Sequence, residues 1–292
     1  MDKIYCIYHG DNCLDGFTSA WVLNEHFKDT RDIVFIPAKY GQPFPELDEG
    51  TDVYIVDFSY PPAVIAEHAS RHNKVVLIDH HKSAVDLYTR FLSSGMSLPP
   101  NVELNFDLEH SGCGLTWKYF YPDVNIPDVV KYVEDRDLWR FTYGDTTRFF
   151  CRALSALSFT FENWNKVNSH PEFVNCLVET GTSLLGDDQK KITWTIEHTL
   201  RPFKFSHDYT VLAVNVPKYL VSETNDLLLK TNNCPHGFVI GYHDTHDGRV
   251  IRLNSAVGSD VDVSKLAAIY GGGGHKHAAS FKVPRDHTLA MA

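Results

Sequence analysis

Hydrophobic and polar positions alternate along the first part of the chain in blocks that predict short strands separated by helices. Four runs rich in β-branched residues, at 4–8, 33–36, 53–57 and 75–79, have the length and composition of strands. Two segments between these runs, 16–27 and 61–71, have helical patterns. Strands that alternate with helices form βαβ units, so we expect a mostly parallel sheet flanked by helices, completed by helices near 127–133 and 172–185.

The rest of the chain predicts a second, smaller α/β domain. Strands are expected at 210–214 and 279–283, a hairpin at 238–254, and helices near 222–230 and 263–270. A helix with a polar face at 187–201 is expected to connect the domains, because Pro202 would end it. We therefore predict an α/β protein with two domains, residues 1–186 and 206–292, joined by a linker helix at 187–205.

The composition is that of an ordinary globular protein, with 43% hydrophobic and 22% charged residues among 292. The start of the chain lacks the apolar stretch of a secretory signal, and no apolar run approaches the ~18 residues of a membrane span. The six cysteines include no C-x-x-C pair, which suits a reducing compartment. These features favour a cytoplasmic protein that does not bind a membrane.

The net charge of −10 argues against electrostatic binding of long duplex DNA or of anionic lipid. Residues 206–292 hold equal numbers of basic and acidic side chains, so the whole acidic excess lies before them. An acidic block of this kind is either a solvated surface or a set of carboxylates gathered for cations. The charge pattern alone leaves both alternatives open.

Imidazoles and carboxylates follow three of the predicted strands at the point where each strand ends. They are His9, Asp15, Asp57, Asp79, His80 and His81. The carboxyl ends of parallel strands lie at one edge of a sheet, where ligand sites form. Divalent cations such as manganese and magnesium bind this mixture of ligands, and two such ions can activate water for phosphoryl transfer. One polar residue at a strand end is usually only a capping residue, but three such clusters favour a metal site.

Two further segments add to this chemistry. Asp135 lies in the acidic run 133–139, which is either a charged helix end or part of a second metal site. The glycine run 271–274 precedes His275, and its backbone N–H groups can face an anion without obstruction by Cβ atoms. We interpret this run as part of a surface that holds substrate rather than as a flexible turn only. The five tryptophans fit either a core or rings on which bases stack, and we expect most of them in the core.

Taken together, these residues resemble the DHH phosphoesterase family. The resemblance covers nearly the whole chain and implies a metal-binding catalytic domain followed by a DHH-associated substrate-binding domain. Members of the family include RecJ-type exonucleases, nano-RNases that degrade short oligonucleotides, phosphatases of 3′-phosphoadenosine 5′-phosphate and cyclic dinucleotide phosphodiesterases. The resemblance rests on the order and spacing of His9, Asp15-Gly16, Asp57, Asp79-His80-His81, Asp135 and the glycine run with His275.

The resemblance implies two divalent ions bridged by Asp57. One ion would be bound by His9, and the other would be completed by Asp15, His80 and Asp135. Manganese is the ion that the resemblance favours. Metal-bound hydroxide would then attack the phosphorus of a phosphodiester.

The resemblance also implies roles around the two ions. Asp79 would orient the His80 ring, because a carboxylate fixes the tautomer and the aim of a ligand imidazole. His81 would face the phosphate as a hydrogen-bond donor or acid. In the second domain, the terminal phosphate or sugar of the substrate would be held by Gly272, Gly273, Gly274 and His275.

Cys13 stands where the family commonly has an aspartate. A thiolate ligand favours zinc or iron over manganese or magnesium, so Cys13 as a ligand would shift the metal preference. Three other interpretations stay open: a first metal site that fills only with substrate, a shift of Asp11 into the ligand position, and a small buried residue with no ligand role.

The second domain also departs from the family pattern. An arginine commonly precedes a serine there, whereas this chain has Asn254-Ser255. Arg252 lies two residues earlier, which places it on the same face of a strand as Asn254. We therefore expect Arg252, Asn254 and Ser255 to contact substrate together with the glycine run.

These inferences predict a phosphodiesterase that hydrolyses short single-stranded oligonucleotides and releases mononucleotides, as a nano-RNase does. A cyclic dinucleotide phosphodiesterase and a phosphatase of 3′-phosphoadenosine 5′-phosphate are alternatives with the same centre. A nucleotide-binding protein with little or no turnover, in which Cys13 and Asn254 mark a decayed site, is an alternative of another class. The oligomeric state stays open, with a homodimer as one alternative.

Overall fold

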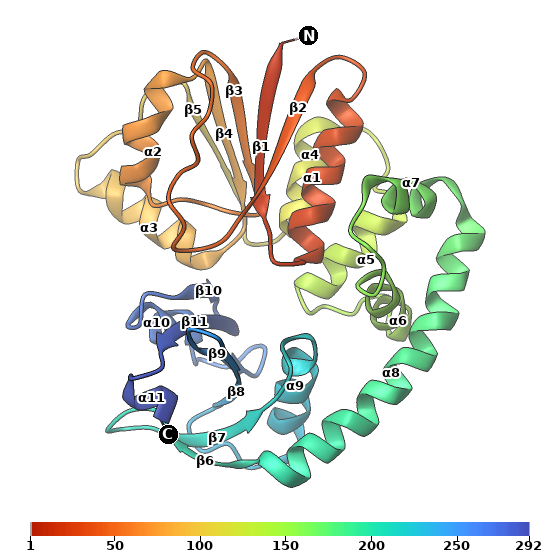
Figure 1. Ribbon diagram of the computed structural model, residues 1–292, viewed down its shortest axis with the longest axis vertical. Coiled ribbons are helices and arrows are strands. Elements are labelled where there is room, and N and C mark those ends of the chain that lie inside the picture. The colour runs from red at the N-terminus through yellow and green to blue at the C-terminus, as the bar shows by residue number, and fades with distance from the viewer. Residues whose placement is uncertain (1, 292) are drawn as a thin grey trace. The chain divides into compact units, whose positions relative to one another are not determined.

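The structure is a computed structural model that describes residues 2–291 of the chain (Figure 1). The chain forms two compact units, which meet along the sequence between Leu185 and Gly186. Each unit combines helices with a sheet, so the predicted α/β class is confirmed. Within the described residues, no helix is long and apolar enough to cross a membrane.

Five parallel strands form the sheet of the first unit, in the order β2-β1-β3-β4-β5. Their bounds are β1 (Lys3–His9), β2 (Asp32–Ala38), β3 (Asp52–Val56), β4 (Lys74–Asp79) and β5 (Val102–Phe106). The first four match the four predicted runs, whereas β5 has no counterpart among them. Since β1 and β4 lie on either side of β3, the residues that follow these three strands meet at one edge of the sheet.

Helices cover both faces of this sheet because side chains alternate between the faces along each strand. One core joins the sheet to α2, the short 3-10 helix η1 and α3, and the other joins it to α1 and α4 (Figure 1). Tyr5 and Ile7 of β1 belong to the first core, and Ile4 and Cys6 to the second. The bounds are α1 (Leu14–Phe27), α2 (Pro62–His68), η1 (Ala69–Arg71), α3 (Lys82–Ser93) and α4 (Gly112–Phe120).

A third core joins α1 and α4 to the helices that follow them along the chain. These are α5 (Asp128–Asp137), α6 (Asp145–Leu154), α7 (Phe161–Ser169) and the first part of α8 (Pro171–Thr199). Trp21 and Trp164 are fully buried here, as expected, and the ring N–H of Trp164 donates to Oγ1 of Thr18 at 2.9 Å. Trp194, by contrast, is 59% exposed.

The helix α8 corrects the prediction of two helices at 172–185 and 187–201, because the structure has a single helix through both segments. Gly186 falls at the expected break, but a glycine inside a helix costs only ~1 kcal/mol and does not by itself end the helix. Gly181 has a packing role instead. A Cβ atom at Gly181 would lie 1.9 Å from the carbonyl oxygen of Phe149, so α8 can approach α6 closely only with glycine at this position.

The second unit is built on a six-stranded sheet in the order β10-β11-β9-β8-β7-β6, in which only β7 and β8 pair in parallel. Apolar residues of this sheet pack against α9, α10 and α11 in two cores. The strand β6 lies in the segment predicted as linker, and its Phe203 is buried in one of these cores. The bounds are β6 (Arg201–Lys204), β7 (Thr210–Asn215), η2 (Lys218–Leu220), α9 (Val221–Thr231), β8 (Phe238–Thr245), β9 (Gly248–Ser255), α10 (Val263–Ala268), β10 (Gly273–His275), β11 (Ala278–Pro284) and α11 (Thr288–Met291).

Candidate metal centre

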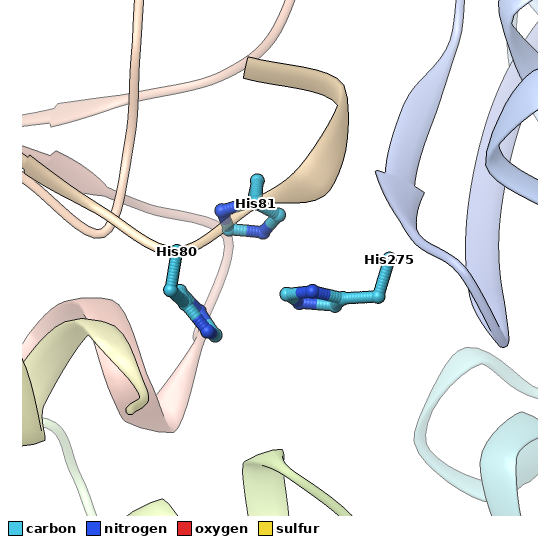
Figure 2. Close-up of side chains that lie close together, drawn as sticks. All are labelled: His80, His81 and His275. Carbon is cyan, nitrogen blue, oxygen red and sulfur yellow. The ribbon is translucent and has the colours of Figure 1, made fainter. Parts of the chain in front are cut away.

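Polar residues from three loops gather at the carboxyl edge of the parallel sheet in the first unit. His9 ends β1, Asp57 directly follows β3, and Asp79 ends β4. His80 and His81 come next after Asp79, and Figure 2 shows their imidazoles where the chain leaves β4. The structure therefore brings together the strand ends that the sequence analysis singled out.

Asp57 occupies the centre of this cluster. Its Oδ1 lies 3.1 Å from Nε2 of His80, whereas its Oδ2 lies 3.5 Å from both Nδ1 of His9 and Sγ of Cys13. The residue is 1% exposed and has a φ of +52°, a left-handed conformation that aspartate adopts more readily than most residues. The two carboxylate oxygens of Asp57 thus face two different sets of ligand atoms.

The first set consists of His9, Cys13 and Asp57, whose ligand atoms lie within 4.8 Å of one another. Cys13 is the residue that caps α1, and its sulfur accepts from the backbone N–H of Gly16 at 3.5 Å. Burial and the negative charges of Asp57 and Asp15 raise the pKa of the Cys13 thiol well above its usual value. The thiol therefore stays protonated unless a cation offsets these charges.

Asp11, considered above as a replacement ligand, lies outside this set. Its carboxylate pairs with Nζ of Lys39 at 3.0 Å, and its backbone φ is +63°. The structure thus offers Cys13, rather than Asp11, as the neighbour of His9 and Asp57.

The second set consists of Asp15, His80 and Asp137, again within 4.8 Å of one another. Nε2 of His80 lies 3.3 Å from Asp15 and 3.5 Å from Asp137, in addition to its contact with Asp57. Burial alone would lower the pKa of His80, but the surrounding carboxylates, above all Asp137, raise it well above its usual value. A positive charge at this point is therefore strongly favoured.

Asp15 is held in place by the start of α4. Its carboxylate accepts from Oγ of Ser111 at 2.8 Å, from N of Gly112 at 2.7 Å and from N of Cys113 at 2.9 Å. Burial would raise the pKa of Asp15, but His80 and these hydrogen bonds lower it, so the carboxylate stays ionised. Gly112 also fits closely below Asp57, since a Cβ atom here would lie 2.4 Å from Cβ of Asp57.

The aspartate of α5 in the second set is Asp137, whereas Asp135 was the residue expected there. Asp135 lies outside both sets, and its carboxylate accepts from the backbone N–H groups of Thr142 and Tyr143 and from the hydroxyl of Thr147. With 3.6 residues per turn, two residues spaced by two point to nearly opposite sides of a helix. Both residues lie in the acidic run 133–139, in which no sequence signal distinguishes Asp137 from Asp135.

Asp79 also differs from its expected role. Its Oδ1 accepts from Nδ1 of His81 at 2.8 Å and from the backbone N–H groups of His80 and His81, while its Oδ2 accepts from Oγ of Ser59 at 2.6 Å. Burial would raise the pKa of Asp79, but His81 and the other partners lower it to about 2. Asp79 therefore orients the ring of His81 through Nδ1, whereas the expected partner was the ring of His80.

Two ligand atoms of the cluster are buried without a hydrogen bond. Within residues 2–291, neither Nδ1 of His9 nor Oδ2 of Asp137 has a hydrogen-bond partner. Buried polar atoms in folded proteins are nearly always satisfied, so each such atom calls for an explanation. Burial and the charge of Asp15 raise the pKa of Asp137, which shows that carboxylates are crowded here. Oxygen and nitrogen donors with unsatisfied lone pairs and excess negative charge fit divalent cations.

One aromatic residue that the sequence analysis missed borders the cluster. The ring centroid of Tyr40 lies 5.6 Å from that of His9 and 6.0 Å from that of His81, and Tyr40 is 51% exposed. It lies beyond the end of β2, where no sequence motif marked it.

In the second unit, the predicted substrate residues lie on adjacent strands. Asn254 on β9 pairs with Ala278 on β11, which in turn pairs with His275 on β10. The same register places Arg252 opposite Ser280, and Ser280 opposite Gly273.

Internal hydrogen bonds occupy several of these residues. The side chain of Asn254 accepts from Nδ2 of Asn225 at 2.9 Å, and Oγ of Ser255 lies 2.9 Å from Nδ1 of His277. The backbone near Gly272 is close to β11, because a Cβ atom at Gly272 would lie 2.2 Å from the carbonyl oxygen of Ser280.

No protein-family model matches the chain. The chain is 28% identical over 293 residues to uncharacterized protein R106 of Acanthamoeba polyphaga mimivirus, an alignment that covers 94% of this chain and 66% of the viral protein. The chain thus spans just under two thirds of the length of that relative.

Among solved structures, a pGpG-specific phosphodiesterase, PggH of Vibrio cholerae, is similar with a TM-score of 0.49 and 14% identity, over 97% of this chain and 94% of that one. An exopolyphosphatase-related protein of Bacteroides fragilis is similar with a TM-score of 0.48 and 14% identity, over 99% of this chain and 89% of that one. RecJ of Thermus thermophilus in complex with Mn2+ is similar with a TM-score of 0.48 and 12% identity, over 97% of this chain and 50% of that one. Similarity at these identities and scores does not assign the chain to a family.

Proposed function

We propose that the chain is a divalent-metal-dependent phosphodiesterase of the DHH type, with its active site at the carboxyl edge of the parallel sheet in the first unit. The observation that carries the proposal is the position of Asp57 between two sets of ligand atoms. A carboxylate with one oxygen toward each set is suited to bridge two ions. His9 and Cys13 would complete one ion site, and Asp15, His80 and Asp137 the other.

Two divalent ions held there would supply an activated water and offset the charge that develops during phosphoryl transfer. The protein's own residues would do the rest. Asp15 is fixed by the start of α4, so this member of the second set is oriented before any ion binds. Gly112 keeps the space beside Asp57 free of a side chain.

His81 is suited to hold a proton near the reacting phosphate. Asp79 accepts from its Nδ1, so the ring has a fixed orientation. Nε2 of His81 would then donate to a phosphate oxygen or to the leaving oxygen. The hydroxyl of Ser59 fixes the other oxygen of Asp79.

Short single-stranded oligonucleotides are the substrates that we propose. A net charge of −10 gives the chain no electrostatic track for long nucleic acids, whose binding depends on many phosphate contacts. The second unit would add a substrate-binding surface formed by Arg252, Asn254, Ser255 and the glycine run before His275. Cyclic dinucleotides and 3′-phosphoadenosine 5′-phosphate are alternative substrates of the same centre.

Hydrolysis of 5′-labelled RNA oligomers of two to ten nucleotides tests this proposal. The same assay would include a cyclic dinucleotide and 3′-phosphoadenosine 5′-phosphate, each with manganese, magnesium or a chelator. We expect stepwise release of mononucleotides from the short oligomers with manganese, and none with the chelator. Preference for another substrate would change the specificity but not the centre, whereas no turnover of any substrate with either metal would contradict the proposal.

The position of Cys13 leads to a prediction about metal preference. A Cys13→Asp variant should gain activity with manganese relative to zinc by about 10-fold, because a hard oxygen donor replaces a soft sulfur donor. Aspartate and serine both cap helices well, so α1 should form in the variant and in its control, Cys13→Ser. The measurement is kcat as a function of metal concentration for both ions. If the preference stays the same in both variants, Cys13 serves α1 only as a cap.

A further inference from the structure

Tyr40, which borders the candidate metal centre, lies at the corner of a tight turn directly after β2. The backbone N–H of Gln42 donates to the carbonyl oxygen of Lys39 at 3.1 Å and closes the turn. Gly41 has a φ of +86°, the conformation that the third residue of a type II turn requires and that glycine adopts without strain. Tyr40 therefore occupies the second position of a well-defined turn.

Two further hydrogen bonds hold this turn in place. Oε1 of Gln42 accepts from the backbone N–H of Lys39 at 2.9 Å, so the side chain of Gln42 closes the turn a second time. At the end of β2, the carbonyl oxygen of Ala38 accepts from the backbone N–H of Gly10 at 2.9 Å. The turn is thus joined to the segment that follows β1, where the first ligand set begins.

Three rings pack against the ring of Tyr40. Its centroid lies 4.8 Å from that of Phe58, 5.6 Å from that of His9 and 6.0 Å from that of His81. Phe58 directly follows Asp57 and is 1% exposed, within the core on one face of the sheet. Tilted and edge-to-face ring pairs at these separations are favourable. The Tyr40 ring is therefore held against two histidines of the cluster.

The rest of the Tyr40 side chain is accessible to a ligand. The residue is 51% exposed, although three rings pack against it. A single exposed aromatic side chain is common on protein surfaces and by itself indicates nothing. The Tyr40 ring differs because the turn and the three neighbouring rings already restrict its conformation. Contact between this ring and a ligand would therefore cost little conformational entropy.

We propose that Tyr40 stacks on a nucleobase of the substrate, next to the phosphate that is cleaved. The inference rests on the proposed function and deepens it, because this contact distinguishes nucleotides from phosphate esters that lack a base. Every base has a π-face, so an aromatic ring accepts bases with little preference for sequence. A base is also uncharged, so the carboxylates around Asp57 do not repel it.

Steady-state kinetics with a Tyr40→Leu variant test the proposal. Leucine removes the ring but keeps an apolar side chain in the turn. The substrates are diadenylate and its two abasic analogues, in which one or the other adenine is replaced by hydrogen. We expect KM for diadenylate to rise about 10-fold with kcat retained, because the base stacks in ground state and transition state alike. For one of the two abasic analogues, the substitution should leave KM unchanged.

Two variants control for the hydroxyl and for the loss of an exposed ring elsewhere. Tyr40→Phe keeps the ring, so its KM for diadenylate should match that of the wild type. Tyr219→Leu is the matched control, because Tyr219 is a tyrosine of similar exposure, 57%, in η2 of the second unit. It should leave KM for all three substrates unchanged. An equal rise of KM in Tyr40→Phe and Tyr40→Leu, or an equal rise for all three substrates in Tyr40→Leu, would overturn the proposal.

The manganese concentration at half-maximal rate is the readout that a merely supporting role of Tyr40 would change. Tyr40 packs against His9, a member of the first ligand set, so loss of such support would raise the manganese requirement. We expect the same requirement in Tyr40→Leu and in the wild type. A raised requirement, together with an equal loss of activity on diadenylate and on both abasic analogues, would contradict base stacking.

Equilibrium binding separates this proposal from the proposed function. If the wild-type protein hydrolyses none of the three substrates with manganese, the proposed function fails, and calorimetric titration of diadenylate in the same buffer then tests Tyr40 by itself. We expect the dissociation constant of Tyr40→Leu to be about 10-fold above that of the wild type, and that of Tyr40→Phe to be unchanged. Equal affinity of all three proteins, or no binding by the wild type, would refute the stacking contact.

Discussion

An Asp57→Asn variant should lose more than about 100-fold of metal-dependent kcat, because residues that merely support metal ligands already contribute ~10–100-fold. The amide keeps the size of the carboxylate and tolerates the φ of +52°, but it offers only one oxygen and no charge. The contacts from Asp57 to His80 on one side and to His9 and Cys13 on the other would no longer share one carboxylate. The measurement is the hydrolysis of a short RNA oligomer with manganese.

Asp11→Asn is the matched control for this variant. Asp11 has a φ of +63°, so the same chemical change is made in the same backbone conformation, and its partner is the exposed Lys39. Exposed ion pairs contribute little to stability, and activity should be unchanged. Thermal unfolding of the Asp57→Asn protein should show a folded chain. Activity close to the wild-type level in that folded protein would remove Asp57 from the bridging position.

Substitutions of Asp137 and Asp135 should have opposite consequences, although the two residues are only two positions apart. Asp137→Asn should reduce kcat more than about 100-fold and raise the manganese concentration needed for half-maximal rate, because Oδ2 of Asp137 faces His80 in the second ligand set. Asp135→Asn should lower thermal stability, because it weakens the hydrogen bonds that hold the loop 138–144. The manganese requirement of that variant should stay the same.

Metal titrations of the reaction rate, together with calorimetric titration of manganese into both variants, distinguish the two aspartates. A large change in the manganese requirement of Asp135→Asn, with Asp137→Asn unaffected, would reverse the assignment and return Asp135 to the ligand set. Loss of manganese binding in both variants would mean that the loop 138–144, which Asp135 holds in place, also supports the metal ligands.

The edge of the sheet where the polar residues meet could be predicted from the sequence, because it depends on few physical rules. Strand runs with helices between them predict a parallel sheet, and parallel strands end at one edge. His9, Asp57 and Asp79 therefore come together whatever their side-chain conformations. The strand β5, by contrast, is short and only half-buried along its length, so its sequence lacks the apolar run of an inner strand.

The choice between neighbouring residues could not be predicted from the sequence, because it depends on rotation about a helix and on packing. Asp135 and Asp137 are both aspartates of α5, so the sequence gives no reason to prefer either one. The rotation of α5 about its axis decides that Asp137 faces His80. Asp79 has two histidines after it, and the direction in which the chain leaves β4 decides that the His81 ring donates a hydrogen bond to its carboxylate. No glycine marks the left-handed positions of Trp139 and Phe141, so the loop 138–144 has no signature in the sequence.

The crowding of carboxylates around Asp57 has a consequence for the folding equilibrium. Asp15, Asp57 and Asp137 repel one another only in the folded chain, so a cation that binds there stabilises the folded state by mass action. At a free concentration of one hundred times its dissociation constant, such a ligand adds about 2.7 kcal/mol. Under the proposed function, the fraction of chain that is folded, and hence protected from proteolysis, would follow the supply of divalent cation in its surroundings.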